Sequence, residues 1–285
     1  MQFKTATVKG VEVFYREAGD RSYPKLLLLH GFPTSSHQYR ELIPALENHF
    51  HIIAPDLPGF GLSPLPDGQL KYTSAYAATV LSGLLQKLGF TRFGLFVQGH
   101  AGPVGLHLLE HQTEWVDWLI IQNADISGSH LTAAWRAVCG PYWLSRSADT
   151  EKAVSGYLKP EMIRQIYTQG HENPAEISPD NWNMDAYFLE RPATRQAQLD
   201  LLYDHRTAAE RYPHWRAMLR ERQPKTLVFW GRDDIFFAPA GADAFVEDIP
   251  GTEIHRLKSG HFAVNDNVEF VARKMIGFHW KHLVD

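Results

Sequence analysis

Four short apolar runs, at 25–29, 93–97, 118–122 and 226–230, most constrain the fold of this 285-residue chain. Each run is nearly continuous rather than alternating, which is typical of a strand that is buried on both faces. Segments with helical periodicity or Gly/Pro-rich loops separate the runs. This alternation predicts a mostly parallel sheet with helices on both faces, that is, an α/β fold.

Weaker patterns complete an expected eight-stranded sheet. A hairpin is predicted at 3–8 and 11–15, and further strands at 51–54 and 253–257. Helices are predicted at about 37–48 and 74–88, from about 102, and from about 268 to the C-terminus. Residues 127–215 have helical periodicity and no buried strand. We therefore predict a core formed by 1–126 and 216–285, with a helical segment, 127–215, inserted after the sixth strand.

The composition excludes several classes of function. The net charge is −4 with no long run of one sign, which disfavours a nucleic-acid partner or an anionic membrane surface. No apolar run approaches the roughly 20 residues that span a bilayer. The single cysteine, Cys139, allows no internal disulfide, and the N-terminus lacks a signal-peptide pattern. The fifteen histidines are scattered and lack the close spacing of a metal cluster. We expect a cytoplasmic protein without metal or cofactor.

The residues that follow the strands carry the chemistry, because ligands of open α/β sheets bind beyond the carboxyl ends of the strands. Four motifs lie at such positions, in this order: His30-Gly31-Phe32-Pro33, Gln98-Gly99-His100-Ala101-Gly102, Gly231-Arg232-Asp233-Asp234 and Ser259-Gly260-His261-Phe262.

These four motifs and their order resemble the α/β-hydrolase fold, and most closely its haloalkane dehalogenase and epoxide hydrolase branch. The resemblance extends over nearly the whole chain and is weakest at 127–215, which it implies to be a helical cap. It implies the chain order of nucleophile, acid and histidine. It also implies a small-molecule substrate.

The nucleophile position departs from this family. The resemblance aligns Gly99 with the aspartate of the dehalogenase nucleophile elbow and His100 with a halide-binding tryptophan. A second register makes Ala101 the apex, but it then puts Pro103 where a small residue is required. Neither register supplies a nucleophile. Either Gly99 simply relaxes a strained turn after covalent chemistry was lost, or its missing side chain leaves room for substrate or water beside a retained base.

The remaining catalytic positions are retained. His261 matches the family's general base, and its near-neutral pKa range suits proton transfer. Asp234 matches the acid that orients this histidine, and Asp125 is an alternative acid. The backbone N–H groups of Phe32 and His100 match an oxyanion or halide hole, which does not depend on side-chain identity.

Several polar or aromatic side chains are further candidates for lining a pocket. Gln98 lies just before Gly99 at the elbow, and His100 lies just after it. Asn123 follows the sixth strand. Within the expected cap, the candidates are Tyr142, Trp143, Trp182, Tyr187 and Tyr203.

Three functions fit these residues. The first is a small-molecule enzyme in which His261 and Asp234 act as a base on water or on an acidic substrate proton, without a covalent intermediate. The second is an ordinary dehalogenase, epoxide hydrolase or esterase that is inactivated at position 99. The third is a catalytically dead ligand-binding protein or sensor. The sequence leaves the substrate and the oligomeric state open.

Overall fold

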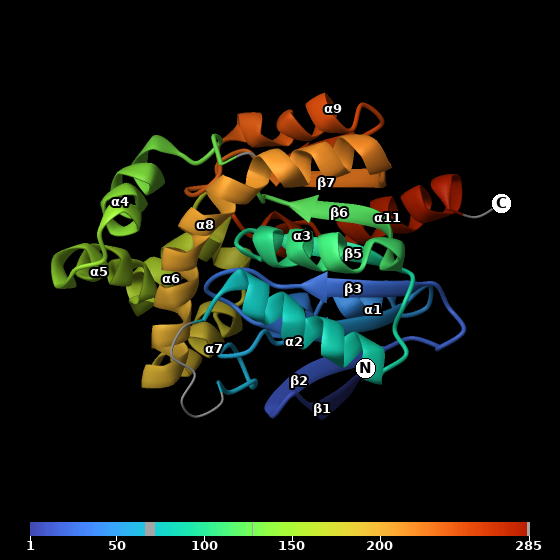
Figure 1. The fold of residues 1–285 in the computed structure, drawn as a ribbon, viewed down its shortest axis with the longest axis horizontal. Helices are drawn as coiled ribbons and strands as arrows, with labels where there is room; N and C mark the ends of the chain where they lie inside the picture. The colour runs from blue at the N-terminus through green and yellow to red at the C-terminus, as the bar shows by residue number, and fades with distance from the viewer. Residues whose placement is uncertain (66–71, 127, 284–285) are drawn as a thin grey trace.

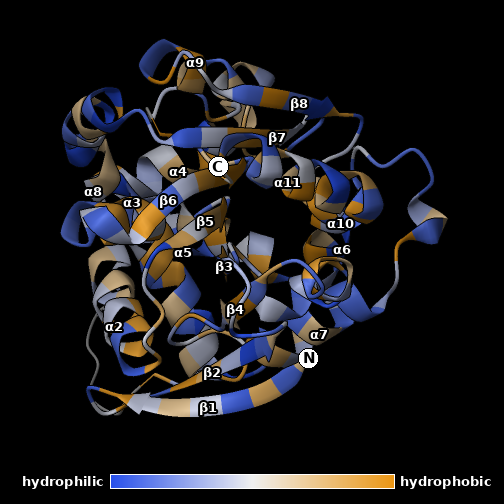
Figure 2. Ribbon diagram, turned by 90° about the vertical axis from the view of Figure 1, so that its right-hand side faces the viewer, coloured by the Kyte–Doolittle hydropathy of each residue, from blue (hydrophilic) through white to orange (hydrophobic). Residues whose placement is uncertain are grey.

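The computed structural model describes residues 1–65, 72–126 and 128–283, and it contains the expected eight-stranded sheet. The strand order is β1-β2-β4-β3-β5-β6-β7-β8, which can be followed from edge to edge in Figure 2. β1 and β2 form the antiparallel hairpin, β2 is antiparallel to β4, and all remaining neighbours are parallel. The strands are Gln2–Val8, Val11–Ala18, Lys25–Leu29, His51–Pro55, Phe93–Gln98, Val116–Gln122, Lys225–Gly231 and Glu253–Leu257. The predicted α/β-hydrolase fold is confirmed.

Helices cover both faces of this sheet, as the apolar runs predicted. Alternate residues of a central strand enter different cores: Leu27 and Leu29 of β3 face one core, whereas Leu26 and Leu28 face the other. The first core contains α2 (Ser74–Lys87) and α3 (Ala101–His111), and the second contains α1 (Leu42–Leu46) and α11 (Val268–His282) (Figure 1). The runs lack alternation because both faces of these strands are buried.

A helical segment joins β6 to β7 and lies beyond the carboxyl ends of the parallel strands (Figure 1). Its helices are α4 (Ala133–Leu144), α5 (Ala148–Ser155), α6 (Pro160–Thr168), α7 (Asp180–Leu189) and α8 (Pro192–Arg222). The long α8 continues past residue 215, so no break in the helix marks the predicted end of the cap. Residue 127, where the predicted cap begins, lies outside the described residues. The domain division stays a prediction.

One predicted helix is wrong. The segment 37–48 forms a 3₁₀ turn, Ser36–Tyr39, followed by the separate short helix α1. Pro44 explains the break: it has no N–H to donate to the carbonyl of Arg40, and its ring would clash with that carbonyl in a continuous helix. In α1, Pro44 instead lies in the first turn, where the N–H groups have no helical partner.

Short elements complete the described chain. They are the helices α9 (Ala244–Asp248) and α10 (Ala263–Asp266) and 3₁₀ turns at Thr113–Trp115, Gly156–Leu158, Pro174–Glu176 and Pro239–Ala242. Among the described residues, no helix is both long enough and apolar enough to cross a membrane.

Candidate active site

The four sequence motifs meet at the carboxyl edge of the sheet. His261, in the loop between β8 and α10, contacts Asp234 from the loop after β7 and Gln98 from the end of β5. The loop after β3 packs against the same group, since a Cβ atom on Gly31 would clash with Oε1 of Gln98. Parallel strands end at one edge, so residues far apart in the chain become neighbours there.

His261 and Asp234 form a buried pair. Nδ1 of His261 lies 2.8 Å from Oδ2 of Asp234, and both side chains are fully buried. The second carboxylate oxygen of Asp234 accepts a hydrogen bond of 2.7 Å from the backbone N–H of Phe236. The neighbouring Asp233 is exposed. Both carboxylate oxygens of Asp234 thus accept hydrogen bonds, which fix the carboxylate so that it can orient the imidazole of His261.

Gly99 has the left-handed backbone of a tight turn, with φ of +53°. Ala101, the apex in the alternative register, is the first residue of α3. A Cβ atom on Gly99 would lie 3.1 Å from Cε1 and 3.2 Å from Nε2 of His261. A side chain at position 99 would therefore point at the reactive edge of the imidazole, and even its first carbon would press against the ring.

Gln98 occupies the edge of His261 that a nucleophile would use. Its Nε2 amide lies 2.7 Å from Nε2 of His261. The carboxylate of Asp234 can only accept, so the ring proton of the neutral imidazole lies on Nδ1 and is hydrogen-bonded to Asp234. The lone pair of Nε2 then faces the Gln98 amide, which is the tautomer of a histidine that can act as a base. Gln122 of β6 also donates to the backbone carbonyl of His261, at 2.9 Å.

His100 lies among aromatic rings at the start of α3. The neighbouring rings, at centroid distances of 5.1 to 6.3 Å, are those of Phe32, Trp135, His205, Phe236 and Phe237. Burial lowers the pKa of His100 well below its usual value, and the nearby His205 and His261 lower it further. The His100 side chain is therefore neutral at physiological pH.

This aromatic cluster contains buried polar atoms without a hydrogen-bond partner among the described residues. They are both ring nitrogens of His100, Nε2 of His205 and Nε1 of Trp135. A buried polar group without a partner costs about 1–3 kcal/mol. Such costs are typically retained where a ligand supplies the missing partner.

The backbone N–H groups of Phe32 and His100 are candidates for an oxyanion hole. Within the described part of the chain, neither N–H donates to a protein acceptor. The side chains of Phe32 and His100 are edge-to-face at 5.6 Å, so the two segments lie side by side. The peptide bond between Phe32 and Pro33 is cis.

Other sequence candidates lie elsewhere. Asp125 accepts a hydrogen bond of 3.0 Å from the backbone N–H of His130, whereas the structure places Asp234 at the imidazole of His261. Asn123 ties β6 to β7 through two hydrogen bonds with the backbone of Gly231. Cys139 is buried, and burial raises the pKa of its thiol.

The aromatic candidates of the helical segment divide into two groups. Trp143 stacks on His205 at 5.6 Å and so borders the aromatic cluster. Tyr187 is exposed, Trp182 and Tyr203 lie under arginine side chains, and Tyr142 donates to the backbone carbonyl of Leu199. Sequence reasoning missed Trp135 and His205, because nothing in a helical pattern says which of several aromatic residues points to the sheet.

From the sequence we expected no histidines with the close spacing of a metal cluster, and this expectation is wrong for one pair. His107 and His111 are four residues apart on α3, and with Glu110 they form a group that could hold a metal ion. The i, i+4 spacing on a helix was the available signal.

Comparisons with known proteins agree with this fold. The alpha/beta hydrolase fold family matches residues 24–268. The chain is 33% identical over 270 residues to "uncharacterized hydrolase YNR064C" of Saccharomyces cerevisiae, covering 94% of this chain and 93% of that protein. It is 38% identical over 280 residues to a haloalkane dehalogenase of Psychrobacter cryohalolentis, covering 94% and 87%. The solved structure of the epoxide hydrolase CorEH has a TM-score of 0.77 at 20% identity, covering 98% and 99%.

The chain therefore belongs to the α/β-hydrolase fold family, in the branch related to haloalkane dehalogenases.

Proposed function

We propose that this protein is an enzyme that acts on a small organic molecule by non-covalent general-base catalysis. The observation that carries the proposal is that His261 retains a buried carboxylate partner, while Gly99, where a Cβ atom would lie 3.2 Å from its Nε2, has no side chain. An attacking group from the protein is missing, whereas the machinery that moves a proton is complete. The helical segment α4–α8 would act as the cap over this site.

In this mechanism, Nε2 of His261 takes a proton either from a water molecule or from an acidic group of the substrate. In the first case, the water oxygen forms a bond to an electrophilic carbon of the substrate, and the electron pair of the bond that breaks moves to the substrate oxygen or to the leaving group. In the second case, as with the hydroxyl of a cyanohydrin, the electron pair of the O–H bond forms a carbonyl, and the leaving group departs with the electron pair of its bond to carbon. Asp234 stabilises the imidazolium that forms, because its carboxylate is negatively charged and accepts a hydrogen bond from Nδ1–H.

The developing negative charge would be stabilised at the N–H groups of Phe32 and His100. These groups need no side-chain chemistry, so the loss of a nucleophile leaves them intact. The unpartnered nitrogens of His100, His205 and Trp135 add donors and acceptors within an otherwise aromatic surrounding. This combination favours a substrate with an apolar body and a polar group.

Gln98 sets a condition on this mechanism. Its amide donates to the lone pair of His261 that must accept the proton. The substrate or a water molecule therefore has to displace that amide before the base can act. Loss of this one hydrogen bond costs about 1 kcal/mol, which substrate binding can offset.

The same contact favours a second candidate, a ligand-binding protein without turnover. A histidine whose Nε2 is already bonded to Gln98 is a satisfied structural group. The buried nitrogens of the aromatic cluster would then bind a ligand that is never converted.

A substrate panel with four variants separates these candidates. The panel contains a haloalkane, an epoxide, an activated ester and a cyanohydrin, and product formation is measured together with binding. For the enzyme we expect His261→Ala to lose about 10²–10⁴-fold in rate and Asp234→Asn to lose about 10²-fold. Gln98→Ala should not lose rate, and the exposed His49→Asn is the matched histidine control. Binding by the wild-type protein with no turnover of any compound would reject the enzyme and support the second candidate.

Restoring a carboxylate tests whether the site is an inactivated covalent one. In a Gly99→Asp variant, a carboxylate oxygen would displace halide from a haloalkane and form an ester, which is detected as added mass on the protein. The close contact between a Cβ at position 99 and His261 argues against simple restoration. We expect no adduct; an adduct that forms and hydrolyses would instead support an ordinary dehalogenase inactivated at this position.

A further inference from the structure

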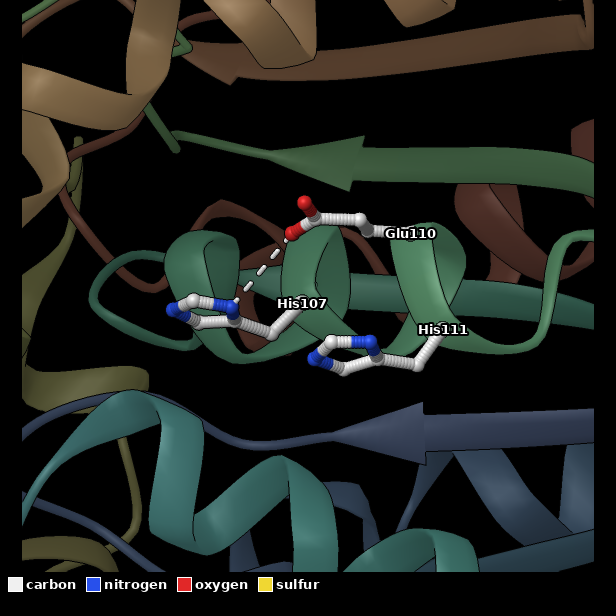
Figure 3. A group of neighbouring side chains, drawn as sticks. All are labelled: His107, Glu110 and His111. Carbon is white, nitrogen blue, oxygen red and sulfur yellow. Dashed lines mark ion pairs between the residues drawn. The ribbon is translucent and has the colours of Figure 1, made fainter.

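A second cluster of ionisable side chains lies on α3. His107, Glu110 and His111 occupy positions i, i+3 and i+4, so they project from adjacent turns of the same helix (Figure 3). One candidate ligand atom from each residue lies within 4.8 Å of those of the other two. Two histidines at this i, i+4 spacing on one helix face bind zinc in metallohydrolases, where the glutamate of the motif acts as the general base.

His107 provides the buried part of this cluster. The residue is 9% exposed, and its Nδ1 is buried without a hydrogen-bond partner among the described residues. This atom points toward Oε2 of Glu110 across 3.7 Å, which is too long for a hydrogen bond (Figure 3). The ring is edge-to-face with Trp215 of α8 at 4.9 Å, which limits its rotation.

His111 provides the accessible part. Its ring is nearly parallel to that of His107, with an interplanar angle of 12° and a centroid distance of 6.2 Å. His111 is exposed and also lines a groove of about 260 Å³ between α2 and α3. Ligand atoms around a tetrahedral zinc ion are about 3.4 Å apart, so small rotations of the exposed His111 and of Glu110 would close the site.

Glu110 links the cluster to α8. Its carboxylate accepts hydrogen bonds from Arg211, at 2.5 and 2.6 Å, and from Nε1 of Trp215, at 3.1 Å. Nε2 of the exposed His214 lies 3.1 Å from the same carboxylate. Arg211 is the competing cation in this position. Its side chain is 42% exposed, so it can move into solvent when another cation binds Glu110.

We propose that His107, Glu110 and His111 form a binding site for one divalent transition-metal ion of the Zn²⁺ type, with water completing the coordination. Two imidazoles and one carboxylate are the ligand set that such ions prefer, whereas Ca²⁺ and Mg²⁺ prefer oxygen alone. All three ligands lie on α3, so the ion would replace Arg211 at the carboxylate of Glu110, while Nε1 of Trp215 of α8 still donates to that carboxylate. The site is separate from the His261 site and does not depend on the proposed activity.

Metal titration of the full-length protein tests this site. The protein is stripped with a chelator and then titrated with Co²⁺, which is followed by its visible absorption, and with Zn²⁺, which is followed by the unfolding temperature. We expect one equivalent to bind and a Zn²⁺-dependent rise in unfolding temperature, since an ion that binds only the folded state stabilises it. Ca²⁺ and Mg²⁺ should produce neither signal.

Variants locate the bound ion. His111→Asn and His107→Phe, which keeps the ring against Trp215, should each weaken binding at least tenfold, whereas the exposed His49→Asn should not. Two outcomes would overturn the proposal. One is that the folded wild-type protein shows no saturable binding of Co²⁺ or Zn²⁺. The other is that the His111→Asn and His107→Phe variants both bind these ions as tightly as the wild type. Arg211→Gln should strengthen binding severalfold, because it removes the competing cation. If Co²⁺ or Zn²⁺ binds this variant no more tightly than the wild type, then Arg211 and the ion do not compete for the carboxylate of Glu110. That result would overturn the three-ligand site.

Discussion

Replacement of Gly99 by alanine measures how closely His261 lies over the elbow. Two terms contribute to the expected loss of stability. The left-handed backbone, with φ of +53°, costs about 1–2 kcal/mol for any residue with a Cβ. The Cβ contacts of 3.1 and 3.2 Å then require the imidazole to move against Asp234, which lies 2.8 Å from it. Such overpacking costs about 1–3 kcal/mol.

Gly89 is a matched control for the backbone term. It also has a left-handed backbone, with φ of +61°, but a Cβ there would meet nothing within 4 Å. Gly89→Ala should therefore cost about 1–2 kcal/mol, and Gly99→Ala about 2–5 kcal/mol. Urea unfolding with linear extrapolation gives both values.

A double-mutant cycle isolates the contact with His261. In a His261→Ala background, the ring is absent and Gly99→Ala should cost no more than Gly89→Ala. The expected coupling energy equals the overpacking cost, about 1–3 kcal/mol, which lies within the range for residues in direct contact. Equal costs for the two glycines together with zero coupling would refute the reasoning, because the imidazole would then not lie over position 99.

Three further predictions concern the surroundings of the site and the attachment of α8. Burial raises the pKa of Asp185 to about 7 from 3.8, so the folded state binds the extra proton between these values. The contribution of Asp185 to stability should then fall as pH rises from 4 to 7, by up to about 4 kcal/mol, and it is measured as the difference between the wild type and Asp185→Asn in pH-resolved urea unfolding. His100→Phe should raise the free energy of unfolding by about 1 kcal/mol, because it removes two unpartnered buried nitrogens. A lower free energy of unfolding would show that these atoms have partners. Ligand binding should weaken in the same variant. Asp248→Ala should destabilise the protein by about 1–3 kcal/mol, since its buried carboxylate binds Arg216 and Arg220 of α8 at 2.6 and 2.7 Å; a thermal melt unchanged from that of wild type would contradict this.

The strands were predictable because burial on both faces leaves a strong local pattern. The runs at 25–29, 93–97, 118–122 and 226–230 each lie within an observed strand, shifted by no more than two residues at either end. The prediction of one helix at 37–48 was wrong, and the reason is also local, because Pro44 interrupts the helix. What the pattern could not supply was the strand order, because pairing depends on contacts between distant segments.

The candidate site was predictable where residues stand directly after strands. Gly99, Asp234 and His261 follow β5, β7 and β8, and they meet because parallel strands end at one edge. The contribution of Gln98 was harder to foresee. It precedes the elbow, and only the side-chain geometry shows that its amide faces Nε2 of His261.

The sequence by itself determined the fold family and placed a glycine at position 99, because a run of apolar residues and the identity of one residue are properties of the chain alone. Tertiary structure decided how the remaining groups act. It set the 2.8 Å contact between His261 and Asp234, gathered His100, His205 and Trp135 into one buried cluster, and brought α8 against Glu110 of α3. These arrangements depend on the packing of helices against the sheet, which joins side chains that no local pattern relates.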